Sequence, residues 1–151
     1  MMPIRVVVQA APFDVAAEIA RLKEAGGAGA IVTFTGVCRD EGGRLQALEL
    51  EHYPGMAEEE IGRIASEAAG RFELAGLTVI HRYGRFSPGD DIVLVAAASL
   101  HRQAAFEAAG FLMDYMKTKA PFWKKERLAD ASENWVGPRA GDDAALDRWR
   151  K

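Results

Sequence analysis

The order in which strand-like and helix-like segments follow one another constrains the fold of this chain most strongly. Runs rich in β-branched or alternating apolar residues predict strands, and apolar residues spaced three or four apart predict helices. Along the chain this gives the order β-α-β-β-α-β-β-α-β-β-α. Because pairs of strands recur between helices, hairpins are favoured over a repeated β-α-β winding. We therefore expect an α+β fold with a mostly antiparallel sheet, formed by residues 1–151 as a single domain.

Individual segments carry finer expectations. The runs over residues 29–37 and 91–99 are almost continuously apolar, which predicts strands buried on both faces. Residues 45–53 alternate and should form a half-exposed strand paired with the run before it. Residues expected to cap helices are Asp14, Ser99 and Asp142. The core-facing stripes of the helices over 56–72 and 102–118 are expected to include Met56 and Phe106. Further strands are expected over 4–9, 77–86, 122–128 and 134–136.

Composition excludes several classes of protein. The net charge of −3 argues against a protein that binds nucleic acid through bulk positive charge. The single cysteine, Cys38, allows neither an internal disulfide nor a thiolate metal cluster, and the three histidines lack the spacing of a metal-binding helix. We therefore expect neither a metal nor a bound cofactor. There is no signal pattern and no apolar stretch of roughly 18 residues, so the expectation is a cytoplasmic protein that does not engage a membrane.

Residues 117–127 form a basic segment in this acidic chain. They include five basic residues and one acid, a charge of +4, although the whole chain has a charge of −3. Pro121, Phe122 and Trp123 lie in the middle of the segment, which is the wrong composition for a plain solvated face. Large apolar residues beside lysines predict a half-buried wall with cations at its edge. Such a wall suits an anionic ligand or an anionic chain terminus.

Two lysines of this segment are candidate catalytic residues. Lys117 lies in the last turn of a predicted helix, where a cation is also favourable for purely structural reasons. Lys124 lies in the extended part, on the side opposite Trp123. The break at Pro121 lets the two lysines converge on one pocket. A lysine that is half-buried near other cations loses its proton more easily, which makes it a usable acid, base or nucleophile at neutral pH.

Three further residues are candidates for binding an anion. His101 and Arg102 begin a predicted helix, where free backbone amide groups attract anions. Positively charged side chains do not stabilise this end of a helix, so their presence suggests an anion-binding role. The alternative is that both side chains are solvated or paired with carboxylates. Arg39 follows a strand and opens a glycine-rich loop, a common place for a ligand-facing guanidinium, although pairing with a neighbouring acid is the favoured reading. Cys38, beside it, has no histidine near it in sequence and is expected to be buried and inert.

Strings of residues add a resemblance to a known family. Residues 29–139 contain, in order, GAIVTFTGVCRD, LELEHYPGM, VIHRYG, PGDDIVLV, HRQAAFEA, MDYMKTKAPFWKKE and WVGPR. This set resembles the large, catalytic subunit of molybdopterin synthase, the MoaE family. The combination of HYPGM with KTKAPFWKKE is its most specific part.

The resemblance implies a fold and a reaction. The fold is of the α/β-hammerhead type with an added small β subdomain. In such enzymes two large subunits form a homodimer, and each binds a small ubiquitin-like sulfur-carrier subunit (MoaD-like), which gives a heterotetramer. The C-terminal Gly-Gly tail of that partner carries a thiocarboxylate and enters a pocket of the large subunit. Two sulfur transfers then convert cyclic pyranopterin monophosphate (precursor Z) to molybdopterin.

The resemblance also implies roles for particular residues. The family's two essential lysines correspond to Lys117 and Lys124. Positions that line its substrate pocket correspond to Arg39, His101, Arg102 and Arg139. One family site draws on both large subunits, which implies a dimer here. Cys38 stands where the family usually has an aliphatic residue, and the resemblance implies that the sulfur stays on the partner.

Two other functions remain compatible with the same residues. A non-catalytic module would dock a ubiquitin-like tail or an anionic metabolite with the same cations, but would not need a lysine with an altered pKa. A lysine Schiff-base enzyme would form carbonyl adducts that borohydride traps, without any partner protein.

Overall fold

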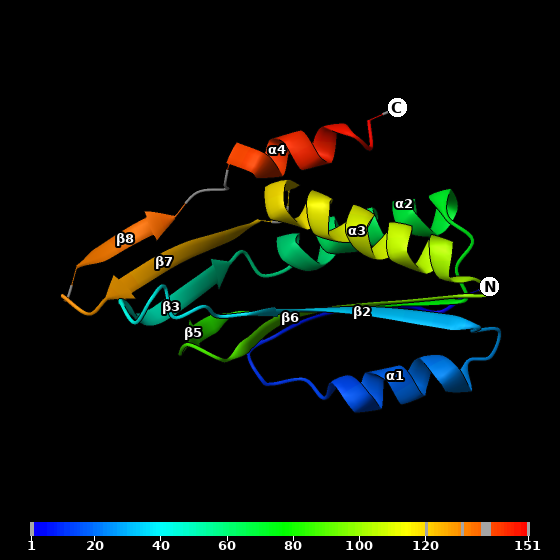
Figure 1. Ribbon diagram of the computed structural model, residues 1–151, viewed down its shortest axis with the longest axis horizontal. Helices are drawn as coiled ribbons and strands as arrows, with labels where there is room; N and C mark the ends of the chain where they lie inside the picture. Colours follow the sequence, from blue (N-terminus) through cyan, green and yellow to red (C-terminus); the bar gives the residue numbers. More distant parts are fainter. Residues whose placement is uncertain (1, 120, 131, 137–139, 151) are drawn as a thin grey trace.

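The strands and helices follow the predicted order, except that three strands and not two lie between the second and third helices (Figure 1). In a computed structural model, residues 2–119, 121–130, 132–136 and 140–150 are described. The strands within these residues are β1 (Ile4–Gln9), β2 (Ala30–Val37), β3 (Leu45–His52), β4 (Gly76–Arg82), β5 (Gly84–Phe86), β6 (Asp91–Ser99), β7 (Phe122–Leu128) and β8 (Glu133–Val136). The helices are α1 (Val15–Glu24), α2 (Met56–Arg71), α3 (Arg102–Lys119) and α4 (Ala140–Asp147). No helix among the described residues is long and apolar enough to cross a membrane.

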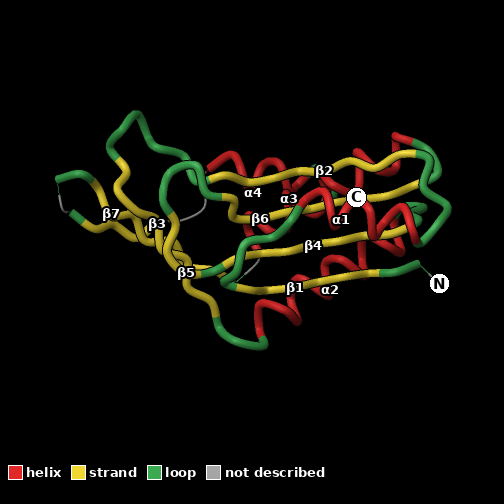
Figure 2. Tube along the Cα trace, turned by 90° about the horizontal axis from the view of Figure 1, so that it is seen from below, coloured by secondary structure: helices red, strands yellow, loops and turns green. Residues whose placement is uncertain are grey.

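The strands form two sheets. The first has the order β1-β4-β6-β2, in which β1 and β4 are parallel and the other neighbours are antiparallel. The second has the order β5-β3-β7-β8 and is antiparallel throughout. Figure 2 shows the first sheet with β2 and β1 as its outer strands, and the second sheet beyond one end of it. The predicted α+β class and mostly antiparallel pairing are confirmed, and the second sheet matches the added β subdomain that the resemblance implies.

The main core lies between the first sheet and two helices. α2 and α3 cover one face of this sheet, α4 lies over α3, and α1 lies against the opposite face (Figure 1). Apolar side chains from both layers interdigitate there and bury the largest continuous apolar area. Fully buried members of this core include Ile61, Ile64, Leu77, Val95, Phe111 and Leu112. A smaller cluster joins Cys38, just after β2, to Leu45, Leu48, Leu50 and Phe86 of the second sheet.

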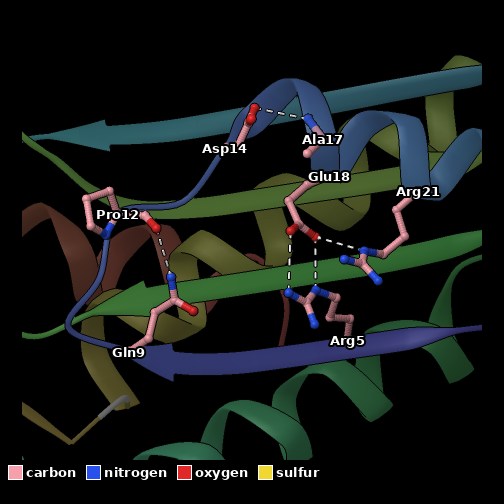
Figure 3. A network of polar contacts seen from close by, with 7 residues as sticks. All are labelled: Arg5, Gln9, Pro12, Asp14, Ala17, Glu18 and Arg21. Atoms are coloured by element: carbon pink, nitrogen blue, oxygen red, sulfur yellow. Dashed lines mark hydrogen bonds and ion pairs between the residues drawn. The ribbon is translucent and has the colours of Figure 1, made fainter.

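A capped and charge-paired helix closes the opposite face of the sheet. Asp14 accepts a hydrogen bond from the backbone N–H of Ala17 at 3.1 Å, so the predicted N-cap of α1 is confirmed. Glu18 on the same helix is buried against the sheet. Its carboxylate accepts a hydrogen bond from Arg5 Nε of β1 at 2.9 Å and lies 3.6 Å from Arg21 Nε (Figure 3). This pairing satisfies a carboxylate that is largely removed from water.

Three strand expectations are wrong. β2 is an outer strand with exposed Phe34 and Val37, so its apolar run marks an exposed edge and not burial on both faces. β3 does not pair with β2, because after the loop that follows Val37 the chain enters the second sheet and lies between β5 and β7. The run over 77–86 is two strands, since the chain passes from one sheet to the other at Gly84, whose φ of 112° favours glycine.

Some helix expectations are also wrong. Ser99 does not cap α3: it ends β6, is buried, and its Oγ donates to the carbonyl of Glu73 at 2.7 Å. Asp142 lies inside α4 and not before it. Phe106 is 62% exposed and Met56 is exposed too. The buried face of α3 consists instead of Ala105, Ala108, Ala109, Phe111, Leu112 and Met116.

Candidate active site

A cavity of about 410 Å³ opens where the two sheets meet the C-terminal end of α3. Its walls draw on β2, β3, β4, β6, β7 and α3, which are far apart in the sequence. Much of the lining is apolar, and includes Leu48 and Leu50 from the second sheet and Val93, Met113 and Met116 from the main layers. A partly apolar cavity with a few convergent charged groups is typical of a binding or catalytic site.

Both predicted catalytic lysines line this cavity. Lys117 lies in the last turn of α3, and Lys124 lies in β7, where it pairs with Leu50 of β3 and Val136 of β8. α3 ends just before Pro121 and β7 begins just after it, so a helix gives way to an extended strand between the two lysines. The alternation of β7 turns Lys124 into the cavity with Phe122, whereas Trp123 is largely exposed and packs edge-on against Tyr53.

The protein lowers the pKa of Lys117 below that of a free lysine. Partial desolvation of its ammonium group is the main cause, and the positive charge of Lys124 adds to it; Arg39 contributes in the same direction and Asp142 opposes the effect. Lys117 is exposed as a residue and lines the cavity. A lysine with a lowered pKa, beside a second cation, is suited to proton transfer or to attack on a carbonyl.

Arg39 lines the same cavity, and it is also paired. Its Nη2 lies 3.3 Å from Glu41 Oε1, so the favoured prediction of pairing with a neighbouring acid is confirmed without removing Arg39 from the site. Glu126 and Asp142 line the cavity as well. The sequence analysis assigned none of these three acids a role in the site. The position of Glu126, two residues after Lys124 on a strand, was a usable signal for it; Glu41 and Asp142 reach the cavity only through the tertiary fold.

His81, at the end of β4, is another lining residue that sequence reasoning considered only as a metal ligand. Its Nδ1 lies 2.8 Å from the carbonyl oxygen of Arg82, and its ring stacks on that of Phe122 with centroids 3.8 Å apart. Burial, followed by the positive charges of Lys117 and Lys124, lowers the pKa of His81 to about 4. The imidazole is therefore neutral at physiological pH.

Cys38 borders the cavity as an inert thiol. Only 2% of its surface is exposed. Burial raises the pKa of the thiol, and the carboxylate of Asp90 raises it further, while Lys124 opposes this effect. Because the thiolate is the reactive form, this environment does not favour a nucleophile or a persulfide carrier. The predicted burial of Cys38 is confirmed.

Comparison with known proteins identifies the family. The sequence profile of the family described as "MoaE protein" matches residues 8–119, well over half of the chain. The chain belongs to the MoaE family. This MoaE chain is 63% identical over 145 residues to the molybdopterin synthase catalytic subunit of Mesorhizobium japonicum, with 95% of this chain and 91% of that protein covered.

Solved structures agree with this assignment. The MoaE chain superposes on molybdopterin cofactor biosynthesis protein E from Burkholderia multivorans with a TM-score of 0.84 at 46% identity, covering 99% of this chain and 97% of that one. Molybdopterin synthase from Staphylococcus aureus gives a TM-score of 0.76 at 29% identity, with 88% and 96% covered. The fold class that the resemblance implies is therefore confirmed.

Two other predicted residues of the MoaE chain, His101 and Arg102, do not lie at its cavity. His101 and Arg102 are exposed at the N-terminal end of α3, whereas Lys117 is in its last turn. At a rise of about 1.5 Å per residue, about 22 Å of helix separates Arg102 from Lys117. Arg139 lies outside the described residues. Of the predicted substrate-binding residues that the structure describes, only Arg39 lines the cavity together with the lysines of the same chain.

Proposed function

We propose that the cavity between the two sheets is the site at which this MoaE chain, a catalytic subunit of molybdopterin synthase, moves sulfur from the thiocarboxylate tail of a small ubiquitin-like subunit to precursor Z. The observation that carries the proposal is the convergence of Lys117, Lys124 and Arg39 in one cavity. The name shared by its close relatives supports the reaction. A cytoplasmic location remains part of the proposal.

The chemistry of the reactants fits these side chains. The tail ends in a thiocarboxylate and the substrate carries a phosphate, so both are anionic and need cations to bring them together. The proposed place of Lys117 is beside the terminal carbonyl of the tail, where its ammonium group stabilises the charge that develops as the acyl–sulfur bond breaks. Its lowered pKa also allows it to give or take a proton near neutral pH. The proposed role of Lys124 is to assist proton transfer and opening of the cyclic phosphate.

The same proposal includes a second copy of the chain that supplies His101 and Arg102. The edge of β2 is exposed, and apolar side chains gather along it and at the start of α3: Phe34, Val37, Leu100 and Phe106. Leu100, for example, is 66% exposed. An exposed strand edge flanked by large apolar residues is a typical surface for association.

The geometry of β2 connects this surface to the site. The Ala30 end of β2 pairs with Ser99, just before Leu100 and the start of α3. The Val37 end borders the cavity. If two copies pair their β2 edges antiparallel about a two-fold axis, the Ala30 end of one copy lies beside the Val37 end of the other. His101 and Arg102 of each copy are then brought towards the cavity of the other copy. In this arrangement the length of α3, which separates these two residues from the cavity of their own chain, is no obstacle.

Reconstitution tests the proposed reaction. The purified chain is mixed with a thiocarboxylated small subunit and precursor Z, and the products are analysed for a dithiolene. The proposal predicts a dithiolene product that requires both the chain and the thiocarboxylate. Binding of the small subunit without product would support the non-catalytic module instead. A borohydride-trapped adduct between a lysine and precursor Z, formed without the small subunit, would support a Schiff-base enzyme.

A further inference from the structure

The C-terminal end of the chain is anchored to α3 through one carboxylate. Asp114 of α3 accepts hydrogen bonds from Arg148 Nε at 3.1 Å and from Arg148 Nη2 at 2.7 Å. The same carboxylate oxygen accepts a third hydrogen bond from Trp149 Nε1 at 2.6 Å. Only 17% of the Asp114 side chain is exposed. Charge-assisted hydrogen bonds of this kind are among the stronger polar contacts of a protein, and we call Asp114, Arg148 and Trp149 the clasp.

Contacts with α2 reinforce the clasp. The Trp149 ring meets the Phe111 ring of α3 edge-on, with centroids 5.5 Å apart. Arg71 of α2 donates a hydrogen bond to the carbonyl oxygen of Trp149 at 2.6 Å, and its guanidinium group lies 5.1 Å from the centre of the Phe111 ring. The end of the chain is therefore held by α2 as well as by α3.

α4 connects the clasp to the cavity, because it lies along α3 and leads directly into Arg148 and Trp149 (Figure 1). Asp142, near the start of α4, lines the cavity, and Leu146 is fully buried. These two residues are four apart, so they share the face of α4 that is turned towards the body of the protein. The backbone N–H of Trp149 donates to the carbonyl of Leu146 at 3.0 Å. The clasp thus follows one end of α4, and Asp142 lies near the other.

The place of α4 affects the balance of charge in the cavity. The charged residues described in its lining are three cations and three acids: Arg39, Lys117, Lys124, Glu41, Glu126 and Asp142. Their formal charges cancel. Glu126 belongs to a central strand of the second sheet, whereas Asp142 is at the wall only while α4 is docked. Loss of Asp142 from the wall leaves an excess of positive charge beside both lysines.

We propose that Asp114 is a positioning residue for the cavity: it binds Arg148 and Trp149, and through them it fixes α4 so that the Asp142 carboxylate stays at the cavity wall. An isolated helix of eight residues is not stable in water, so α4 depends on its contacts with α3 for its structure and its place. The role deepens the proposed function of the same cavity and rests on it only for its relevance to turnover.

Hydrogen–deuterium exchange tests whether the clasp fixes α4, and it uses the chain alone. Arg148→Ala removes two of the three hydrogen bonds to Asp114, and should speed amide exchange over residues 140–147 about tenfold. Asp114→Ala removes all three and should speed it further. Exchange over the buried first half of α3 should stay as in the parent chain, which shows that both variants are folded.

Competitive labelling tests whether the clasp acts on the cavity. A limiting amount of acetic anhydride reacts with neutral amines, and mass spectrometry gives the extent for Lys117 relative to Lys119, which lies on the same helix and outside the cavity lining. Asp142 opposes the lowering of the Lys117 pKa, so its displacement by Arg148→Ala should raise the labelling of Lys117 about twofold. Removing the positive charge of Arg148 acts directly in the opposite sense, so a rise reports the displacement of Asp142.

Two further variants separate positioning from a merely structural role. Arg150→Ala removes the same charge two residues later, but Arg150 donates to Asp147 at 2.8 Å, so exchange and labelling should both match the parent chain. Asp142→Asn should raise the labelling of Lys117 as Arg148→Ala does, without loosening α4. In the double variant the two effects on labelling should not add, because both remove the same carboxylate charge from the wall.

Three results would overturn the proposal: unchanged exchange over α4 in Arg148→Ala and Asp114→Ala, equal loosening by Arg150→Ala, or fully additive effects of Arg148→Ala and Asp142→Asn on the labelling of Lys117. Absence of a dithiolene product in the reconstituted reaction of the parent chain would count against the proposed function and leave the exchange and labelling results intact.

Discussion

At the scale of single residues, burial and neighbouring charge decide which groups of the cavity can react. Lys117 and Cys38 both border it, yet their environments act in opposite ways. The lowered pKa of Lys117 makes a neutral amine more accessible, while burial and Asp90 raise the pKa of the Cys38 thiol and suppress its reactive thiolate. These two environments fit the proposed reaction, in which Lys117 acts and the partner subunit supplies the sulfur.

Replacing Cys38 with serine tests this contrast. Cys38→Ser should keep kcat within about twofold, because the thiol is buried and its protonated form is favoured, while burial of a hydroxyl should cost about 1–3 kcal/mol of stability. Turnover is followed with the thiocarboxylated small subunit, and unfolding by urea. The matched control is Cys38→Ala, which removes the polar atom. A folded Cys38→Ser protein that has lost most of its turnover would revive a role for the thiol.

The residues of the site were predictable where the local sequence determined the direction in which their side chains point. The proline break between Lys117 and Lys124, and the alternation that separates Lys124 from Trp123, are local features, and the structure follows both. His81 was missed, because β4 reaches the cavity only through long-range strand pairing. The spacing of residues along the sequence does not indicate which strands pair.

At the scale of elements, local signals gave the boundaries of strands and helices but not their partners. The cap at Asp14 and the end of α3 before Pro121 depend on neighbouring residues, so they were predictable. The pairing of β3 with β7 joins segments that are separated by most of the central chain. An alternating pattern shows that β3 has two unlike faces, but it contains no information about which strand lies beside it.

The docking of α1 on the first sheet yields a prediction from two arginines that share one carboxylate. Arg5→Ala removes the 2.9 Å hydrogen bond to Glu18 and leaves a buried carboxylate poorly paired, so it should lower the free energy of unfolding by about 1–3 kcal/mol. Arg21→Ala removes an exposed ion pair and should cost less than about 1 kcal/mol. Urea unfolding of both variants measures the difference. Equal losses would show that the buried pair does not anchor α1 as described.

At the scale of the whole molecule, the proposed dimer accounts for the separation of Arg102 from Lys117 along α3. A single chain brings both lysines and Arg39 together, but it leaves His101 and Arg102 at the far end of the helix. The exposed apolar edge of β2 links these two regions in the proposed two-fold arrangement. The resemblance raised this possibility, and the fold supplies a route by which it can occur.

Subunit mixing tests whether the site is shared. Lys117→Ala and Arg102→Ala chains carry different affinity tags, are allowed to exchange subunits, and the doubly tagged species is isolated. If Arg102 acts on the cavity of its partner, one of the two sites in a mixed dimer is intact, and turnover should recover to about half that of the parent dimer. If turnover of the mixed species does not exceed that of either single variant, Arg102 does not act on the cavity of a second copy. If no doubly tagged species forms, the proposed dimer is wrong.

The most direct test of the central claim compares two lysines that lie two residues apart on one helix. Lys117 lines the cavity, whereas Lys119 does not. Turnover of precursor Z to the dithiolene is measured under single-turnover conditions with the thiocarboxylated small subunit, after circular dichroism has shown that both variants fold. The account predicts that Lys117→Ala lowers the rate by about a hundredfold or more, while Lys119→Ala stays within about threefold. A Lys117→Ala chain that forms product at the parent rate would contradict it.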